Sequence, residues 1–207
     1  MPEGHDVSAT LICAPCIAQP PRQDGLTAAT LYNDASRQLV LSFKHGRKIT
    51  MGKLLGRMMA GRLPPLEGKW LIVPVPLYRW HIWSRGFNQA AVLAQHIAEV
   101  TGHECLPDAL VRMRRTRSLG GLDRRARART LAGAIRLHPK RGGLIKGAQV
   151  LLIDDVVTSG ATTDACLRVL RKGGAKTIRV ACFARVMDEA LPFVKGQSIR
   201  GQEISDP

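Results

Sequence analysis

A continuous apolar run from Val150 to Ile153 leads directly into two adjacent carboxylates and then into a turn of hydroxyls and glycine. Apolar residues then recur at helical spacing from Cys166 to Leu170. A short apolar run flanked in this way predicts a strand buried on both faces, followed by a turn and a helix. This order predicts an α/β fold with a parallel sheet, in which ligands bind at the carboxyl edge of the strands.

The turn after this strand has the chemistry of a phosphate-binding site. Its glycine lets the backbone approach an anion closely, its hydroxyls can donate hydrogen bonds, and the first N–H groups of the next helix have no partner within that helix. The two carboxylates need another partner, because acids beside an anion are costly, and the neighbouring hydroxyls of ribose 5-phosphate supply one. The residues expected to bind it are Asp154, Asp155, Val157, Thr158, Ser159, Gly160, Ala161 and Thr162. The alternative is a structural turn whose acids are simply solvated.

The net charge narrows the list of partners. The 207-residue chain carries 31 Lys and Arg against 16 Asp and Glu, which gives a formal charge of +15. Such a field attracts polyanions, namely a phosphorylated small molecule, nucleic acid or an anionic membrane surface; an arginine-rich composition without a specific partner is the alternative. The sequence contains no P-loop or dinucleotide-binding glycine pattern. It also shows no signal-peptide pattern and no apolar run near the ~20 residues that span a bilayer, so we expect a cytoplasmic protein without a membrane span.

A second anion site is expected after an earlier strand. The apolar run Trp70–Pro76 predicts the first strand of the sheet, and Gly86–Gln89 opens an amphipathic helix after an intervening basic segment. A strand that continues through a basic loop into a helix N-terminus can bind an anion at the same edge of the sheet. The residues of this second site are Pro74, Val75, Pro76, Arg79 and Arg85. A positively charged surface turn is the alternative.

Other segments complete the expected sheet and its helices. Helical spacing predicts two helices before the strand at Trp70, from Ala28 to about Phe43 and from Met51 to Ala60. Short strands are expected at residues 110–112 and 134–137, and a longer one at residues 176–184. The domain itself is expected to span residues 27–190, between an N-terminal segment at 1–26 and a polar tail at 191–207.

Arginines are densest between residues 113 and 129. Glycines and charge predict a mobile loop in the first half of this segment and a basic helix in the second. Arginine suits phosphate because its planar group donates two hydrogen bonds at once, so the segment could close over bound pyrophosphate or follow a nucleic-acid backbone. A solvated basic helix is the alternative. The residues of this basic loop are Arg115, Arg117, Ser118, Arg124, Arg125, Arg127 and Arg129; Arg112 and Arg114 extend it as a surface for single strands.

The cysteines do not form a disulfide pattern. Cys105, Cys166 and Cys182 stand singly and are expected in the core. Cys13 and Cys16 have a spacing that can present two thiolates to one metal, but a structural zinc takes four ligands. We therefore expect an incomplete zinc half-site, the remnant of a zinc ribbon, with a complete zinc site and a redox pair as alternatives.

Four of these features together resemble the ComF family of competence proteins: Val73–Pro76, Arg85–Gln89, the arginine-rich loop and Leu152–Thr162. The resemblance runs from about residue 13 to about residue 185. It implies a type I phosphoribosyltransferase-like domain, a parallel sheet flanked by helices with a small hood, joined to a zinc ribbon of which only Cys13 and Cys16 remain. It further implies that the acidic pair and hydroxyl turn hold phosphoribosyl pyrophosphate (PRPP) with Mg²⁺, and that the second anion site is the pyrophosphate loop.

Three functions fit this resemblance. The first is a PRPP-binding protein linked to natural competence, DNA uptake and the handling of single-stranded DNA. The second is an active phosphoribosyltransferase that moves ribose 5-phosphate from PRPP to a nitrogenous base, and the third is a basic adaptor with a vestigial site. The segments expected to form the hood are residues 105–111 and the helices before Trp70. They show no set of polar groups that would recognise a base, which favours PRPP binding over catalysis. The expected partners are PRPP or a related phosphoribosyl ligand, single-stranded DNA, and other DNA-uptake or replication-restart proteins.

Overall fold

Five parallel strands form the main sheet of the computed structural model, which describes residues 20–45, 50–78, 86–114, 129–131 and 133–186. The order across the sheet is β1 (Leu26–Leu31), β7 (Thr177–Arg185), β6 (Gln149–Val157), β2 (Trp70–Pro74) and β3 (Glu104–Cys105). Each neighbouring pair is parallel. The predicted parallel α/β fold is therefore confirmed, and it places the carboxyl ends of these strands along one edge.

The central strand is β6, which lies between β7 and β2. Val150 and Leu152 belong to one buried cluster, whereas Leu151 and Ile153 belong to the other, and none of the four is more than 1% exposed. The prediction of a strand buried on both faces is confirmed. The strand is longer than its apolar run, because pairing with β7 continues through the two acids as far as Val157.

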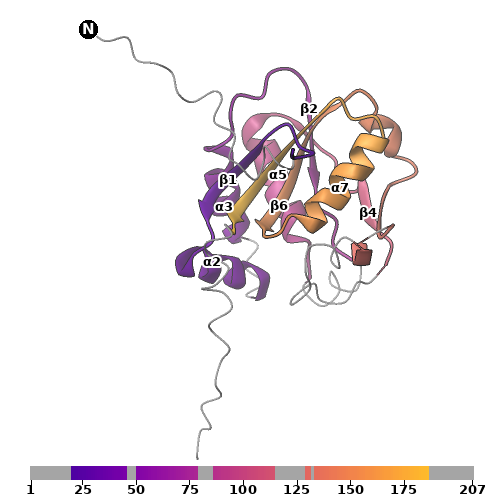
Figure 1. Ribbon diagram of the computed structural model, residues 1–207. Helices are drawn as coiled ribbons and strands as arrows, with labels where there is room; N and C mark the ends of the chain where they lie inside the picture. Colours follow the sequence, from indigo (N-terminus) through magenta and orange to yellow (C-terminus); the bar gives the residue numbers. More distant parts are fainter. Residues whose placement is uncertain (1–19, 46–49, 79–85, 115–128, 132, 187–207) are drawn as a thin grey trace, which may run out of the picture.

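Two layers of helices cover the sheet (Figure 1). On one face lie α7 (Ala161–Lys172) and a two-stranded antiparallel sheet of β4 (Leu110–Arg112) and β5 (Ile135–Leu137), followed by the 3₁₀ turn η2 (Gly142–Ile145). On the other face lie α2 (Asp34–His45), α3 (Thr50–Ala60) and α5 (Gln89–Thr101). Each face thus has its own apolar core, and burying a large aliphatic side chain in either stabilises the fold by about 1.5–3 kcal/mol.

The N-terminal part of the domain differs from the prediction. The sequence predicts a helix that begins at Ala28, but residues 26–31 form β1, which pairs with β7, and α2 begins only at Asp34. The start of α2 is fixed by reciprocal bonds, in which the Ser36 N–H donates to Asn33 Oδ1 at 2.9 Å and the Asn33 N–H donates to Ser36 Oγ at 2.8 Å. The helical prediction is wrong there because the open edge of β7 supplies backbone partners that local spacing cannot reveal. The strand at Trp70 is consequently the second in the chain.

Most of the remaining elements match their predictions; the exceptions are β3 and η2, which were not predicted. α3, α5, β4, β5, β7 and α7 lie within a few residues of the predicted ranges. No helix in the described part of the chain is long and apolar enough to cross a bilayer. The predicted N-terminal segment lies largely outside the described residues, and the polar tail lies wholly outside them.

Candidate functional site

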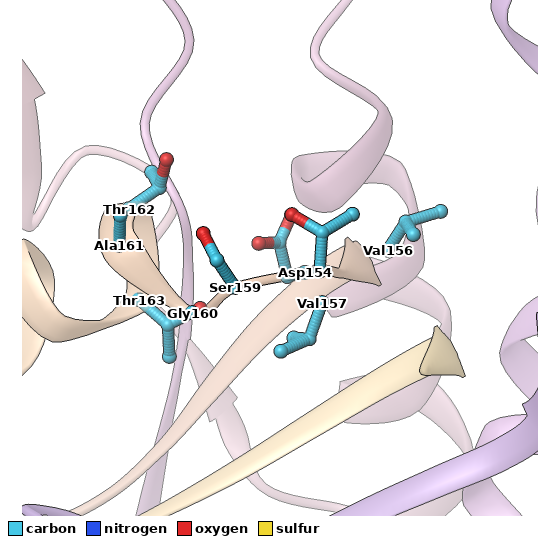
Figure 2. A pocket seen from close by; sticks show the side chains of 9 residues that line it. Asp154, Val156, Val157, Ser159, Gly160, Ala161, Thr162 and Thr163 are labelled. Atoms are coloured by element: carbon cyan, nitrogen blue, oxygen red, sulfur yellow. The ribbon is translucent and has the colours of Figure 1, made fainter. Parts of the chain in front are cut away.

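A pocket forms where the end of β6 turns into α7, at the carboxyl edge of the sheet (Figure 2). Its lining residues are Asp154, Val156, Val157, Thr158, Ser159, Gly160, Ala161, Thr162 and Thr163. Every residue predicted for the ribose 5-phosphate site lines this pocket except Asp155. The structure thus brings together the glycine, the hydroxyls and one carboxylate in one place.

The turn depends on the backbone of Gly160, which is the N-cap of α7. Its φ is 74°, in the left-handed region, while a side chain at this position would meet no atom within 4 Å. Glycine is therefore required by the backbone angle and not by a lack of space. The N-cap residue itself has no side chain to cap the helix, and the Asp164 N–H donates to the Gly160 carbonyl at 2.7 Å. The N–H groups of the first turn thus face the pocket, an arrangement that suits an anion.

Asp154 is the carboxyl group of this pocket. It is half-buried and reaches the pocket surface. Its Oδ1 accepts a hydrogen bond from the Asp155 N–H at 2.9 Å. Burial and, after it, the charge of Asp155 raise the pKa of Asp154 well above its ordinary value, and the positive charge of Lys44 opposes them in part. A ribose hydroxyl that donated to Asp154 would relieve this unfavourable burial.

Three further groups lie close enough to Asp154 to interact with its charge. Cys182 is its partner on β7, and Cys166 lies on α7. Burial raises the pKa of both thiols, that of Cys182 to about 12, so both are protonated core residues, as predicted. The third group is Arg112 on β4. The sequence predicts Arg112 on an open nucleic-acid surface, but it is half-buried: burial lowers its pKa, and the charge of Asp154 opposes that effect.

Asp155 is held on the other side of β6. Lys44, in the last turn of α2, places its Nζ 2.7 Å from Asp155 Oδ2, and the Val156 N–H donates to Asp155 Oδ1 at 2.8 Å. Successive side chains of a strand point to opposite faces of the sheet, so the side chains of Asp154 and Asp155 lie on opposite faces. Sequence reasoning assigned no role to Lys44, because nothing local indicates that α2 ends above this part of β6. Ligand binding by Asp155 stays a prediction.

The second predicted anion site lies at the same edge. Pro74 is paired with Ile153, and the Val75 N–H donates to the Ile153 carbonyl at 2.8 Å. Asn88 caps α5 through its Oδ1, which accepts from the Ala90 N–H, while its Nδ2 donates to the Val75 carbonyl at 3.1 Å. The side chains of residues 74–76 are buried, so only their backbone could meet a ligand. Arg79 and Arg85 lie outside the described residues.

The basic loop begins and ends at the β4–β5 pair. The Met113 N–H donates to the Ala134 carbonyl at 2.8 Å, which brings its two ends together. Arg112, just before the loop begins, lies near Asp154, so this end of the loop lies beside the pocket. Arg129 is exposed. The other predicted residues of the loop lie outside the described part of the chain: Arg115, Arg117, Ser118, Arg124, Arg125 and Arg127.

The metal predictions are not tested by this structure. Within the described ranges, no group of three or more His, Cys, Asp or Glu side chains could hold a metal ion. Cys13 and Cys16, the predicted zinc half-site, lie outside those ranges.

Comparison with known proteins agrees with the family that the sequence resembles. The family model for a phosphoribosyl transferase domain matches residues 82–203. The DNA utilization protein YhgH of Salmonella typhi is 32% identical over 193 residues, which cover 90% of this chain and 82% of that protein. Competence protein F of Haemophilus influenzae is 30% identical over 179 residues, which cover 84% of this chain and 78% of that protein. A solved glutamine PRPP amidotransferase from B. subtilis is 20% identical with a TM-score of 0.42, over 63% of this chain and 25% of that one.

Proposed function

Because the chain belongs to the ComF family of competence proteins, with a phosphoribosyltransferase-type domain, we propose that it binds PRPP in the pocket between β6 and α7. One observation carries the proposal: the N-terminus of α7, a turn of hydroxyls and the Asp154 carboxyl group line the same pocket. The 5-phosphate binds at the N–H groups and hydroxyls of the turn. The ribose hydroxyls donate to the acidic pair. Each charge-assisted hydrogen bond of this kind contributes about 1.5–3 kcal/mol.

Mg²⁺ is part of this proposal as a companion of the ligand. Pyrophosphate and ribose oxygens are the hard ligands that Mg²⁺ prefers, so the ion enters with PRPP and neutralises part of its charge. The pyrophosphate group then extends toward the backbone at the end of β2. The basic loop begins beside Asp154, and its arginines supply further positive charge for the pyrophosphate group.

The proposed cellular role is in natural competence, DNA uptake and the handling of single-stranded DNA. The names of the relatives, which refer to DNA utilization and competence, support this role. The formal charge of +15 and the arginine-rich loop favour contacts with a nucleic-acid backbone, which would be sensitive to salt and largely independent of sequence. PRPP binding and DNA binding would then occur in one domain, with the β4–β5 pair between them.

An active phosphoribosyltransferase is the second candidate, favoured by the match to a phosphoribosyl transferase model. In that reaction a nitrogen nucleophile forms a bond to C1 of ribose while the C1–O bond to pyrophosphate breaks, and the electron pair leaves with pyrophosphate. The protein would act electrostatically, by stabilising the charge on the leaving group. If an added nitrogenous base causes pyrophosphate to be released from PRPP, the protein transfers ribose 5-phosphate; if no pyrophosphate is released, it only binds PRPP.

Calorimetric titration with PRPP and Mg²⁺, with and without a single-stranded oligonucleotide, tests the main proposal. In the double variant Asp154→Asn/Asp155→Asn, PRPP affinity should fall at least tenfold, since it loses charged acceptors for the hydroxyls. Inorganic pyrophosphate is the matched control, because it has no ribose and gains from the removal of two negative charges. If the double variant binds PRPP as tightly as the parent does, the two acids do not bind the ribose hydroxyls.

A further inference from the structure

The ion pair between Lys44 and Asp155 joins α2 to β6 on the face opposite α7. Lys44 Nζ lies 2.7 Å from Asp155 Oδ2, and 24% and 16% of the two side chains are exposed. The Arg171–Asp24 pair is as short, at 2.6 Å, but its side chains are more exposed, at 35% and 42%. Because charges shielded from water are screened less, Lys44 offsets the charge of Asp155 more than an exposed cation would.

The pair leaves the two adjacent acids in different situations. Asp155 already uses both carboxylate oxygens, with Oδ2 bound to Lys44 and Oδ1 accepting from the Val156 N–H at 2.8 Å. Asp154 accepts one backbone N–H at Oδ1 and lines the pocket, whereas Asp155 does not line it. The geometry therefore makes Asp154 the carboxylate that a ligand meets first, with Asp155 held behind it.

The charge balance at Asp154 depends on the same pair. The groups that act on its charge are Asp155 on β6, Lys44 on α2, Arg112 on β4, Cys166 on α7 and Cys182 on β7. Apart from burial, the charge of Asp155 is the main cause that raises the pKa of Asp154, and Lys44 lowers it. The thiols carry no charge, because burial raises their pKa values. Neutralising Asp155 thus favours the ionised form of Asp154.

We propose that Lys44 is a positioning residue of the ligand site, which fixes and neutralises Asp155 so that the Asp154 carboxylate meets the ribose hydroxyls. This inference rests on the PRPP site proposed above. Lys44 acts through Asp155 and does not touch the ligand. A hydroxyl binds a carboxylate about five- to tenfold more strongly than a neutral acceptor, so Lys44 matters most where Asp154 is partly protonated.

The test is a pH series of calorimetric PRPP titrations with Mg²⁺, from about pH 5 to 8, on the full chain. In Lys44→Met, the midpoint of the pH dependence should move to higher pH, so that between the two midpoints affinity should fall below that of the parent by up to about five- to tenfold. Lys44→Arg keeps the charge and should retain the parent midpoint. Adding Asp155→Asn to Lys44→Met removes the charge that Lys44 neutralises, so the double variant should return toward the parent midpoint.

Two controls separate positioning from other roles. Arg171→Met breaks the comparably short pair with Asp24, which lies near the start of β7, away from the pocket, so it should leave the PRPP midpoint unchanged. Inorganic pyrophosphate should bind Lys44→Met and the parent alike. If pyrophosphate loses as much affinity as PRPP does, Lys44 contacts the ligand directly and the positioning role is wrong.

The outcomes distinguish this inference from the function on which it rests. If the parent protein does not bind PRPP, both the proposed function and the role of Lys44 are wrong. A parent that binds PRPP, together with a Lys44→Met variant of unchanged midpoint, overturns the role of Lys44 alone. If Lys44→Met does not fold, Lys44→Arg and Lys44→Met/Asp155→Asn decide the matter, because a shifted midpoint in either contradicts the proposal.

Discussion

The substitution Asp154→Asn should stabilise the protein and weaken its binding of PRPP. Burial and the neighbouring Asp155 raise the pKa of Asp154 from its ordinary value of 3.8, so its charged form is unfavourable in the folded state. Asparagine keeps an oxygen that can accept the Asp155 N–H, but it removes the charge. Relieving the desolvation of a buried polar or charged group is worth on the order of 1–3 kcal/mol, which corresponds to a rise in Tm of roughly 2–12 °C for a domain of this size.

The pH dependence gives the sign of this effect. A carboxyl group with a raised pKa in the folded state destabilises the fold as pH rises above the ordinary value and through the raised one. The gain from Asp154→Asn should therefore be complete above the raised pKa, and it should disappear as pH approaches 3.8. Replacing a charged acceptor with a neutral one weakens its hydrogen bond by about 1–1.4 kcal/mol, so PRPP affinity should fall about five- to tenfold at neutral pH.

Thermal unfolding at several pH values, together with calorimetric titration of PRPP with Mg²⁺, measures both effects on one sample. Asp155→Asn is the matched control, because it leaves Lys44 without its partner and should lower Tm where Asp154→Asn raises it. Under the role inferred for Lys44, it should also cost less PRPP affinity than Asp154→Asn does. The reasoning is refuted if Asp154→Asn lowers Tm at neutral pH, or if it binds PRPP as tightly as the parent.

Three more predictions address the turn, the loop and the N-terminal cysteines. Gly160→Ala forces a side chain into the left-handed region at a cost of about 1–2 kcal/mol, so Tm should fall by roughly 2–8 °C in thermal unfolding; an unchanged Tm would mean that the turn relaxes freely. Replacing Arg124, Arg125, Arg127 and Arg129 with Gln should flatten the salt dependence of oligonucleotide binding, and an identical slope would remove these arginines from the interface. The two N-terminal cysteines supply only half of a tetrahedral zinc shell, so metal analysis of tag-free protein should find less than one zinc per chain.

The central strand and its turn could be predicted because their signals are local. The apolar run before Asp154 and the glycine after it define a strand and a helix start without reference to other segments. β1 could not be recognised in this way, since its apolar spacing also fits a helix and its strand form depends on β7, far along the chain. The ion pair of Lys44 could not be predicted either, because nothing local shows that the end of α2 lies against β6. The separation of the acids followed from strand alternation once β6 was seen to continue through them.

The pairing of β1 with β7 has a consequence for folding during synthesis. Leu26 pairs with Val180, which is 180 − 26 = 154 residues later in the chain. At ~5–20 residues per second, the ribosome needs roughly 8–31 s after making β1 before that partner exists. β1, at the edge of the sheet next to β7, has no strand to pair with during this interval. β7 also pairs with β6 at Asp154, so the ligand site should be complete only once β7 has been made.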